Sequence, residues 1–138
     1  MLYLKNQRVK IGINPLGAEL QELTHVEHGN LLWKKDDGLW NRFAPILFPI
    51  VGRLVNDQYT LEGEVYTMRQ HGFARDQVFE VLEYNETSAT LCIKANEDTR
   101  AQYPYEFEYT PLLLDNSYTL APIRDSPVLP SERTPLIV

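Results

Sequence analysis

The sequence is poor in the features that mark secreted, membrane-bound and nucleic-acid-binding chains. Cys92 is the single cysteine, which excludes an internal disulfide or a cysteine-rich metal site and favours a cytoplasmic location. The 138 residues carry 13 Lys and Arg against 19 Asp and Glu, and this net charge of −6 argues against a nucleic acid or an anionic membrane as partner. No apolar run approaches the roughly 20 residues that a membrane span needs, and the N-terminus lacks the long apolar stretch of a secretion signal.

Helix signals are scarce as well, whereas apolar and polar residues alternate with the period of a β-strand. Asn96 caps the one short helix that we expect, which Pro104 ends. Gly63 supplies the tight turn of a hairpin over residues 59–68. The other expected strands are residues 9–13, 20–23, 31–33, 78–84, 89–94 and 105–110. This pattern predicts a mainly β fold, an antiparallel β-sandwich with few short helices.

The last part of the chain has a different composition. Five of the nine prolines lie beyond residue 110, and Pro111 cannot donate a hydrogen bond to a central strand ladder. We therefore expect residues 1–110 to form the packed unit and residues 111–138 to form a Pro-rich, poorly packed tail, in which residues 117–120 are a further strand candidate.

A first unusual segment spans residues 40–54. Pro45 and Pro49 interrupt an apolar run, which predicts an edge or an irregular crossing rather than an ordinary strand. Arg42 and Arg53 bracket this segment. From the residues alone, both are more often surface arginines whose stems lie on apolar groups while their guanidinium groups reach water.

A second unusual segment spans residues 69–76. It places His71 before Gly72, with Arg75 and Asp76 close behind, which is a composition typical of a polar ligand-binding turn. His71 can donate a hydrogen bond or exchange a proton near neutral pH, and Arg75 can hold ligand oxygens in a forked geometry. The alternative is a structural turn in which Arg75 pairs with Asp76, and the residues alone do not separate the two.

Most glutamates, Glu19 among them, alternate with apolar residues, so a solvated strand face is their expected position. His25, Glu27 and His28 resemble metal ligands superficially, but a polar turn before Gly29 is the favoured interpretation because the sequence identifies no further ligand to join them. We predict no metal site and no cofactor.

Several segments together resemble the galactose mutarotase-like superfamily, and in particular its aldose 1-epimerase-related branch known as LacX-like. The match covers roughly residues 1–110 and is strongest at Gln70-His71-Gly72-Phe73-Ala74-Arg75. Its other pieces are Gly17-Ala18-Glu19-Leu20, Asn30-Leu31-Leu32-Trp33, residues 42–53 and Tyr103-Pro104.

The resemblance implies part of a β-supersandwich that binds a hexose and interconverts its anomers. His71 matches a family histidine that binds sugar hydroxyls and polarises the reacting oxygens, and Arg53 matches a sugar-contacting arginine. Arg42 and Arg75 resemble arginines that some relatives use against a sugar phosphate, which makes a hexose-6-phosphate mutarotase an alternative.

The family's acid lies in a Gly-Gly-His-Pro-like segment and its base is a Glu near the C-terminus, and neither segment occurs here. We therefore expect only the first half of the sandwich, with weak or no activity of this polypeptide alone. A non-catalytic carbohydrate-binding fragment is a further alternative, and uncovered strands predict self-association.

Overall fold

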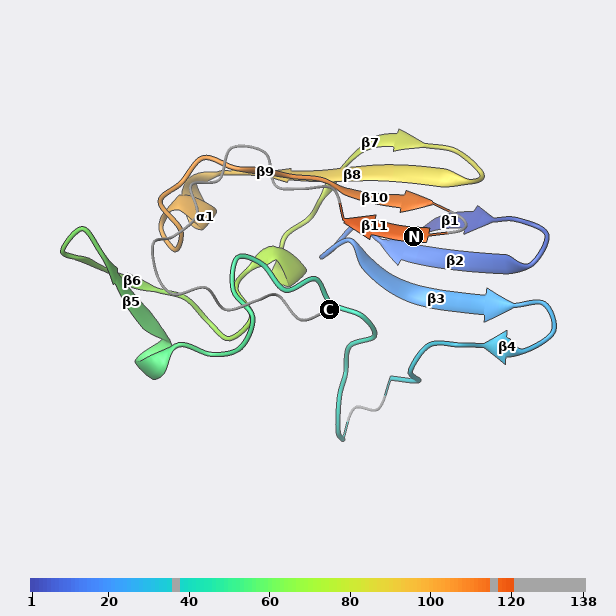
Figure 1. The fold of residues 1–138 in the computed structure, drawn as a ribbon, viewed down its shortest axis with the longest axis horizontal. Coiled ribbons are helices and arrows are strands. Elements are labelled where there is room, and N and C mark those ends of the chain that lie inside the picture. The colour runs from blue at the N-terminus through green and yellow to red at the C-terminus, as the bar shows by residue number, and fades with distance from the viewer. Residues whose placement is uncertain (36–37, 115–116, 121–138) are drawn as a thin grey trace.

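The computed structural model describes residues 1–35, 38–114 and 117–120, the residues from 111 onward by their backbone. Figure 1 shows two antiparallel sheets one against the other, with a separate two-stranded hairpin reaching away from them at one end. In the described part, the helical elements are one short α-helix and two 3₁₀ turns, so the predicted mainly β antiparallel fold is confirmed.

The first sheet follows the chain order β1-β2-β3-β4. Its strands are β1 (Leu2–Lys5), β2 (Val9–Asn14), β3 (Glu19–His25) and β4 (Gly29–Asn30). The register between β2 and β3 shifts at Gly12, where a Cβ atom would lie 2.9 Å from the side chain of Glu22. Glycine at this position therefore lets the two strands pack closely at a bulge.

The second sheet has the order β11-β10-β8-β7, and β9 pairs with one end of β8. Its strands are β7 (Glu80–Tyr84), β8 (Ser88–Lys94), β9 (Glu108–Tyr109), β10 (Pro111–Leu114) and β11 (Ser117–Leu120). Pro111 opens its strand opposite Leu120 of β11, and the pairing of β10 with β8 begins one residue later at Leu112. The proline is thus accommodated where a strand begins.

A hairpin, two 3₁₀ turns and one α-helix complete the described elements. The strands β5 (Gln58–Leu61) and β6 (Glu64–Thr67) form the hairpin predicted around Gly63, which has a φ of +89°. The 3₁₀ turns η1 (Val55–Asp57) and η2 (Ala74–Asp76) flank this hairpin in the chain. The helix α1 (Glu97–Arg100) is capped by the preceding residue, Asn96. The Asn96 side chain accepts a hydrogen bond from the Thr99 N–H, and the Thr99 hydroxyl oxygen accepts one from the Asn96 N–H.

The core lies between the sheets and continues into the irregular segment that joins them. Apolar side chains from both sheets form one cluster, and Phe48 of the irregular segment packs its ring against Phe73, Phe107 and Tyr109. Because Phe48 is 6% exposed, the Pro-interrupted segment is anchored in the core rather than draped over the surface. Residues 42–54 thus form the irregular crossing that Pro45 and Pro49 predict, and the Phe48–Pro49 peptide bond is cis.

One strand prediction was wrong and another was correct only in part. Residues 31–33 form no strand, and Leu31 and Trp33 are 53% and 50% exposed, because an Asx turn at Asn30 redirects the chain and no described strand continues the sheet beyond β4. In residues 105–110, the strand is shortened to β9, opposite Ile93 and Lys94, and the Phe107 carbonyl oxygen accepts a further hydrogen bond from the Ala95 N–H at 3.0 Å.

The predicted boundary at residue 110 stays a prediction. Residues 111–114 and 117–120 extend the second sheet, and residues 121–138 lie outside the described part. Among the described residues, every helix is too short to cross a membrane.

Candidate functional site

The candidate site begins where the irregular segment meets the chain that follows β6. Phe48 and Gly72 form an isolated parallel bridge, and the Phe48 carbonyl oxygen accepts hydrogen bonds from the N–H groups of Phe73 and Ala74, at 2.9 and 3.2 Å. Gly72 has a φ of +71°, and a Cβ atom there would overlap the Phe48 carbonyl. Glycine is required here because the two backbones approach too closely for any side chain.

His71 is held at this junction by two hydrogen bonds to Gly52. Its backbone N–H donates to the Gly52 carbonyl oxygen at 2.8 Å, and its ring Nδ1 accepts from the Gly52 N–H at 2.9 Å. Because Nδ1 serves as the acceptor, the neutral ring carries its proton on Nε2. The backbone φ of His71 is +68°, a left-handed conformation that is uncommon for a residue with a side chain. The local fold thus orients the ring and selects one tautomer.

Arg53 follows directly after Gly52, so the same two hydrogen bonds bring its backbone close to His71. Its guanidinium group forms a bidentate ion pair with Asp57, with Nε–Oδ1 and Nη2–Oδ2 distances of 2.7 Å. The hydrogen bond from Arg53 lowers the pKa of Asp57. The Arg53 side chain is 65% exposed, so the pair orients the guanidinium group at the surface rather than burying it.

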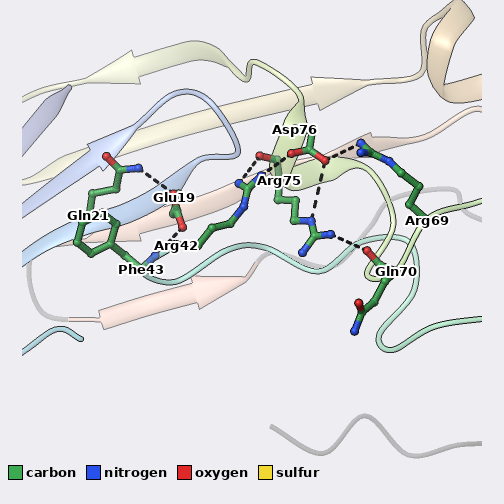
Figure 2. Close-up of polar contacts among 8 residues, drawn as sticks. All are labelled: Glu19, Gln21, Arg42, Phe43, Arg69, Gln70, Arg75 and Asp76. Carbon is green, nitrogen blue, oxygen red and sulfur yellow. Dashed lines mark hydrogen bonds and ion pairs between the residues drawn. The ribbon is translucent and has the colours of Figure 1, made fainter. Parts of the chain in front are cut away.

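Asp76 lies at the centre of a cluster of three arginines (Figure 2). Arg42 Nη2 and Arg69 Nη2 donate to opposite carboxylate oxygens, at 2.5 and 2.9 Å. Arg75 Nε lies 4.0 Å from the same carboxylate, is buried, and makes no hydrogen bond within the described part of the chain. The cluster therefore places three positive charges against one negative charge.

Arg42 and Arg75 are also tied to the backbone. Arg42 Nη1 donates to the Arg75 carbonyl oxygen at 3.1 Å, and Arg75 Nη2 donates to the Gln70 carbonyl oxygen at 2.8 Å (Figure 2). The first bond links the start of the irregular segment to η2. The second fixes Gln70, the residue before His71. Arg75 thus lies within ion-pair distance of Asp76, and whether the turn also binds a ligand stays a prediction. Arg42 is not a purely surface arginine, because its side chain is 28% exposed.

The position expected for Glu19 was wrong. Glu19 is 4% exposed rather than on a solvated face, because its carboxylate accepts hydrogen bonds from the Gln21 side chain at 2.8 Å and the Phe43 N–H at 3.0 Å (Figure 2). These partners compensate the loss of water around the carboxylate. Glu19 thus anchors the irregular segment to β3. The anchored residue, Phe43, directly follows Arg42.

The structure sorts the four predicted site residues into two groups. His71 and Arg53 are joined through Gly52, and Arg42 and Arg75 are joined through Asp76. The site residues expected from the sequence did not include Asp57 or Arg69, although Arg69 opens the unusual segment 69–76. The four-residue spacing between Arg53 and Asp57 was the available signal for the first, and no sequence signal separates Arg69 from an ordinary surface arginine.

The comparisons with known proteins agree with this architecture. A family model described as aldose 1-epimerase matches residues 1–112. The plasmid-encoded protein LacX of Lactococcus lactis subsp. lactis is 38% identical over 110 residues, which cover 76% of this chain and 37% of that protein.

Two solved structures have the same fold over most of this chain. A galactose mutarotase related enzyme from Lactobacillus acidophilus is 41% identical, with a TM-score of 0.78 and coverage of 83% of this chain and 39% of that one. A galactose mutarotase-like protein from Lactobacillus casei ATCC 334 is 37% identical, with a TM-score of 0.79 and the same coverage.

These matches, on a β-rich fold with a His-Gly turn held against a Gly-Arg segment, establish the class of the protein. The chain belongs to the aldose 1-epimerase family. It spans well under half the length of the relatives that it matches.

Proposed function

We propose that this chain binds a hexose and contributes to the interconversion of its anomers. The observation that carries the proposal is the hydrogen bond from the Gly52 N–H to His71 Nδ1. It leaves the Nε2–H of neutral His71 as a donor for a sugar oxygen. Arg53, adjacent to Gly52, supplies further donors, and the mutarotase-like relatives support a sugar as the ligand.

The proposed chemistry follows from what each group can do. Anomer exchange transfers a proton from the C1 hydroxyl to a base and adds a proton to the ring oxygen, and reclosure reverses both transfers. A fixed Nε2–H donor stabilises the negative charge that develops on a sugar oxygen during ring opening, and the Arg53 guanidinium group adds positive charge beside it. The resemblance assigns the acid and the base to later family segments, so we expect weak or no turnover by this polypeptide alone.

The test is sugar binding by isothermal titration calorimetry together with polarimetry on freshly dissolved α-glucose and α-galactose. The variant His71→Asn removes the Nε2–H donor, and Asn tolerates the left-handed backbone at this position. We expect affinity to fall roughly tenfold, which corresponds to one lost hydrogen bond. His28→Asn, on an exposed turn, is the matched control and should bind sugar like the parent chain.

Two results would refute the proposal: no heat with either sugar, or equal affinity of the His71→Asn variant and the parent chain. Heat of binding with even weak acceleration of the change in optical rotation would support the isomerase function. Heat of binding without any acceleration would identify this polypeptide by itself as a non-catalytic carbohydrate-binding chain.

A sugar phosphate is the second candidate ligand, and the cluster around Asp76 favours it. Three guanidinium groups face one carboxylate, and the Arg69 side chain is 70% exposed. A phosphate is well matched to forked guanidinium donors. Hexose 6-phosphate should then bind more tightly than hexose, and Arg69→Gln should abolish that preference while leaving hexose affinity unchanged.

The single cysteine, which is buried, supports a cytoplasmic location for either function.

A further inference from the structure

The turn between β3 and β4 gathers three side chains with metal-binding atoms. His25, Glu27 and His28 each offer one ligand atom, and these atoms all lie within 4.8 Å of one another. Ligand atoms of a tetrahedral Zn²⁺ ion, each at about 2.0–2.2 Å from the metal, lie roughly 3.3–3.6 Å apart. The three side chains must therefore draw together by up to roughly 1 Å, which rotation of exposed side chains on a turn can supply. The sequence favoured a polar turn without a metal, and the tertiary structure adds the convergence that the sequence did not reveal.

The fold of the hairpin explains the convergence. His25 pairs with Gly29 across the end of the two strands, and the Val26 N–H donates to the Arg8 carbonyl oxygen at 2.9 Å. Gly29 has a φ of +71°, which lets the chain reverse within a few residues. This reversal stacks the imidazole rings of His25 and His28, with centroids 4.7 Å apart and an interplanar angle of 22°. The two rings therefore lie next to each other before any ion binds.

We propose that this turn binds a divalent transition-metal ion, with Zn²⁺ as the best match, through His25, Glu27 and His28. Two imidazoles and one carboxylate are a ligand set that suits Zn²⁺ and its neighbours rather than Mg²⁺ or Ca²⁺. Water completes the coordination, because Glu27 and His28 are exposed. The net charge of −6 of the chain favours a cation at its surface.

One hydrogen bond must give way on binding. His25 Nδ1 accepts from the Glu27 N–H at 3.1 Å. This bond is lost whether the ion takes the Nδ1 lone pair or binds Nε2 while the ring proton moves to Nδ1, and the Glu27 N–H then turns to water. Glu27 is exposed, so water can replace the lost acceptor. Binding therefore costs one hydrogen bond of the turn, and the three protein ligands replace water molecules that the free ion carries.

The composition of the chain makes a sharp test possible, because it contains three histidines in all. Two of them are the proposed ligands and the third, His71, is the internal control. We would titrate the full chain with ZnCl₂ in a weakly coordinating buffer, follow the three pairs of imidazole proton resonances by NMR, and measure affinity by calorimetry. The expected result is saturation at one ion per chain, with the His25 and His28 resonances shifted and the His71 resonances unchanged.

Three variants complete the test. His28→Ala and Glu27→Gln should each weaken Zn²⁺ binding by at least roughly 10- to 100-fold. This is the loss of affinity typical when a residue that only hydrogen-bonds to a metal ligand is removed, and removing a ligand itself should cost no less. His71→Ala should bind Zn²⁺ like the parent chain. Binding that is not saturable, that shifts His71 as strongly as the other two histidines, or that persists unchanged in His28→Ala would overturn the proposal. Unchanged NMR spectra of the ion-free variants would show that their folds are intact.

Discussion

At the scale of single residues, two glycines with the same backbone conformation have different surroundings. Gly72 and Gly63 both have positive φ, at +71° and +89°. A Cβ atom at Gly72 would overlap the Phe48 carbonyl, whereas no atom lies within 4 Å of the Cβ position at Gly63. Local sequence indicates a turn at both positions, but the contact with Phe48 exists only in the folded chain.

We predict that Gly72→Ala destabilises the chain by about 2 kcal/mol or more, because it combines backbone strain with overlap of Phe48. Gly63→Ala adds only the strain and should cost about 1 kcal/mol. Urea denaturation, followed by tryptophan fluorescence, measures both changes. Equal losses in the two variants would contradict the close approach at Gly72.

At the scale of elements, β3 carries one glutamate inward and another outward. Glu19 is 4% exposed and accepts hydrogen bonds from Gln21 and Phe43. The Glu22 side chain is 33% exposed and pairs with Lys10 at 3.0 Å. Of these two glutamates, Glu19 is the one that connects β3 to the irregular segment, which carries Arg42 and, further on, Arg53.

We predict that Glu19→Gln lowers the free energy of unfolding by roughly 1–3 kcal/mol, because one carboxylate acceptor becomes an amide donor that faces the Gln21 amide. Glu22→Gln makes the same chemical change on the same strand and should stay within about 0.5 kcal/mol of the parent. Chemical denaturation at neutral pH provides the comparison. If the two variants lose the same stability, the anchoring role of Glu19 is refuted.

Elements with strong local signals were predictable from the sequence. The β5–β6 hairpin follows from Gly63, and α1 follows from the Asn96 cap. Residues 31–33 have the apolar composition of a strand, yet after one hydrogen bond from the Leu31 N–H to the Leu23 carbonyl oxygen the chain turns away from β3, and Leu31 and Trp33 remain about half exposed. The apolar run indicated burial but did not indicate a partner.

At the scale of the whole molecule, apolar residues remain exposed on the edge of the second sheet. The edge strand β7 is exposed along its length. Its pairing register with β8 shifts between Val81 and Glu83, and Leu82, which lies at this shift, is 45% exposed. Unpaired edges with apolar side chains favour association with another chain.

We predict that the chain self-associates with increasing concentration, measured by sedimentation velocity. Leu82→Lys should weaken this association at least roughly tenfold, because a charged side chain on an edge strand opposes pairing. Val55→Lys, at an 84% exposed position of η1, is the matched control and should leave it unchanged. A monomer at all accessible concentrations would contradict the prediction, and equal effects of both variants would place the contact elsewhere.

The sequence by itself determined the strand periodicity and the hairpin and helix-cap positions, because these depend on side-chain type and short-range spacing. The site roles expected for His71, Arg53, Arg42 and Arg75 came from the resemblance to the family. Only the tertiary structure decided how these residues are paired. The contacts Gly52–His71, Glu19–Phe43 and Arg42–Asp76 join residues 19 to 34 positions apart. Contacts at such separations form only when the core around Phe48 brings the segments together, and local propensity carries no record of them.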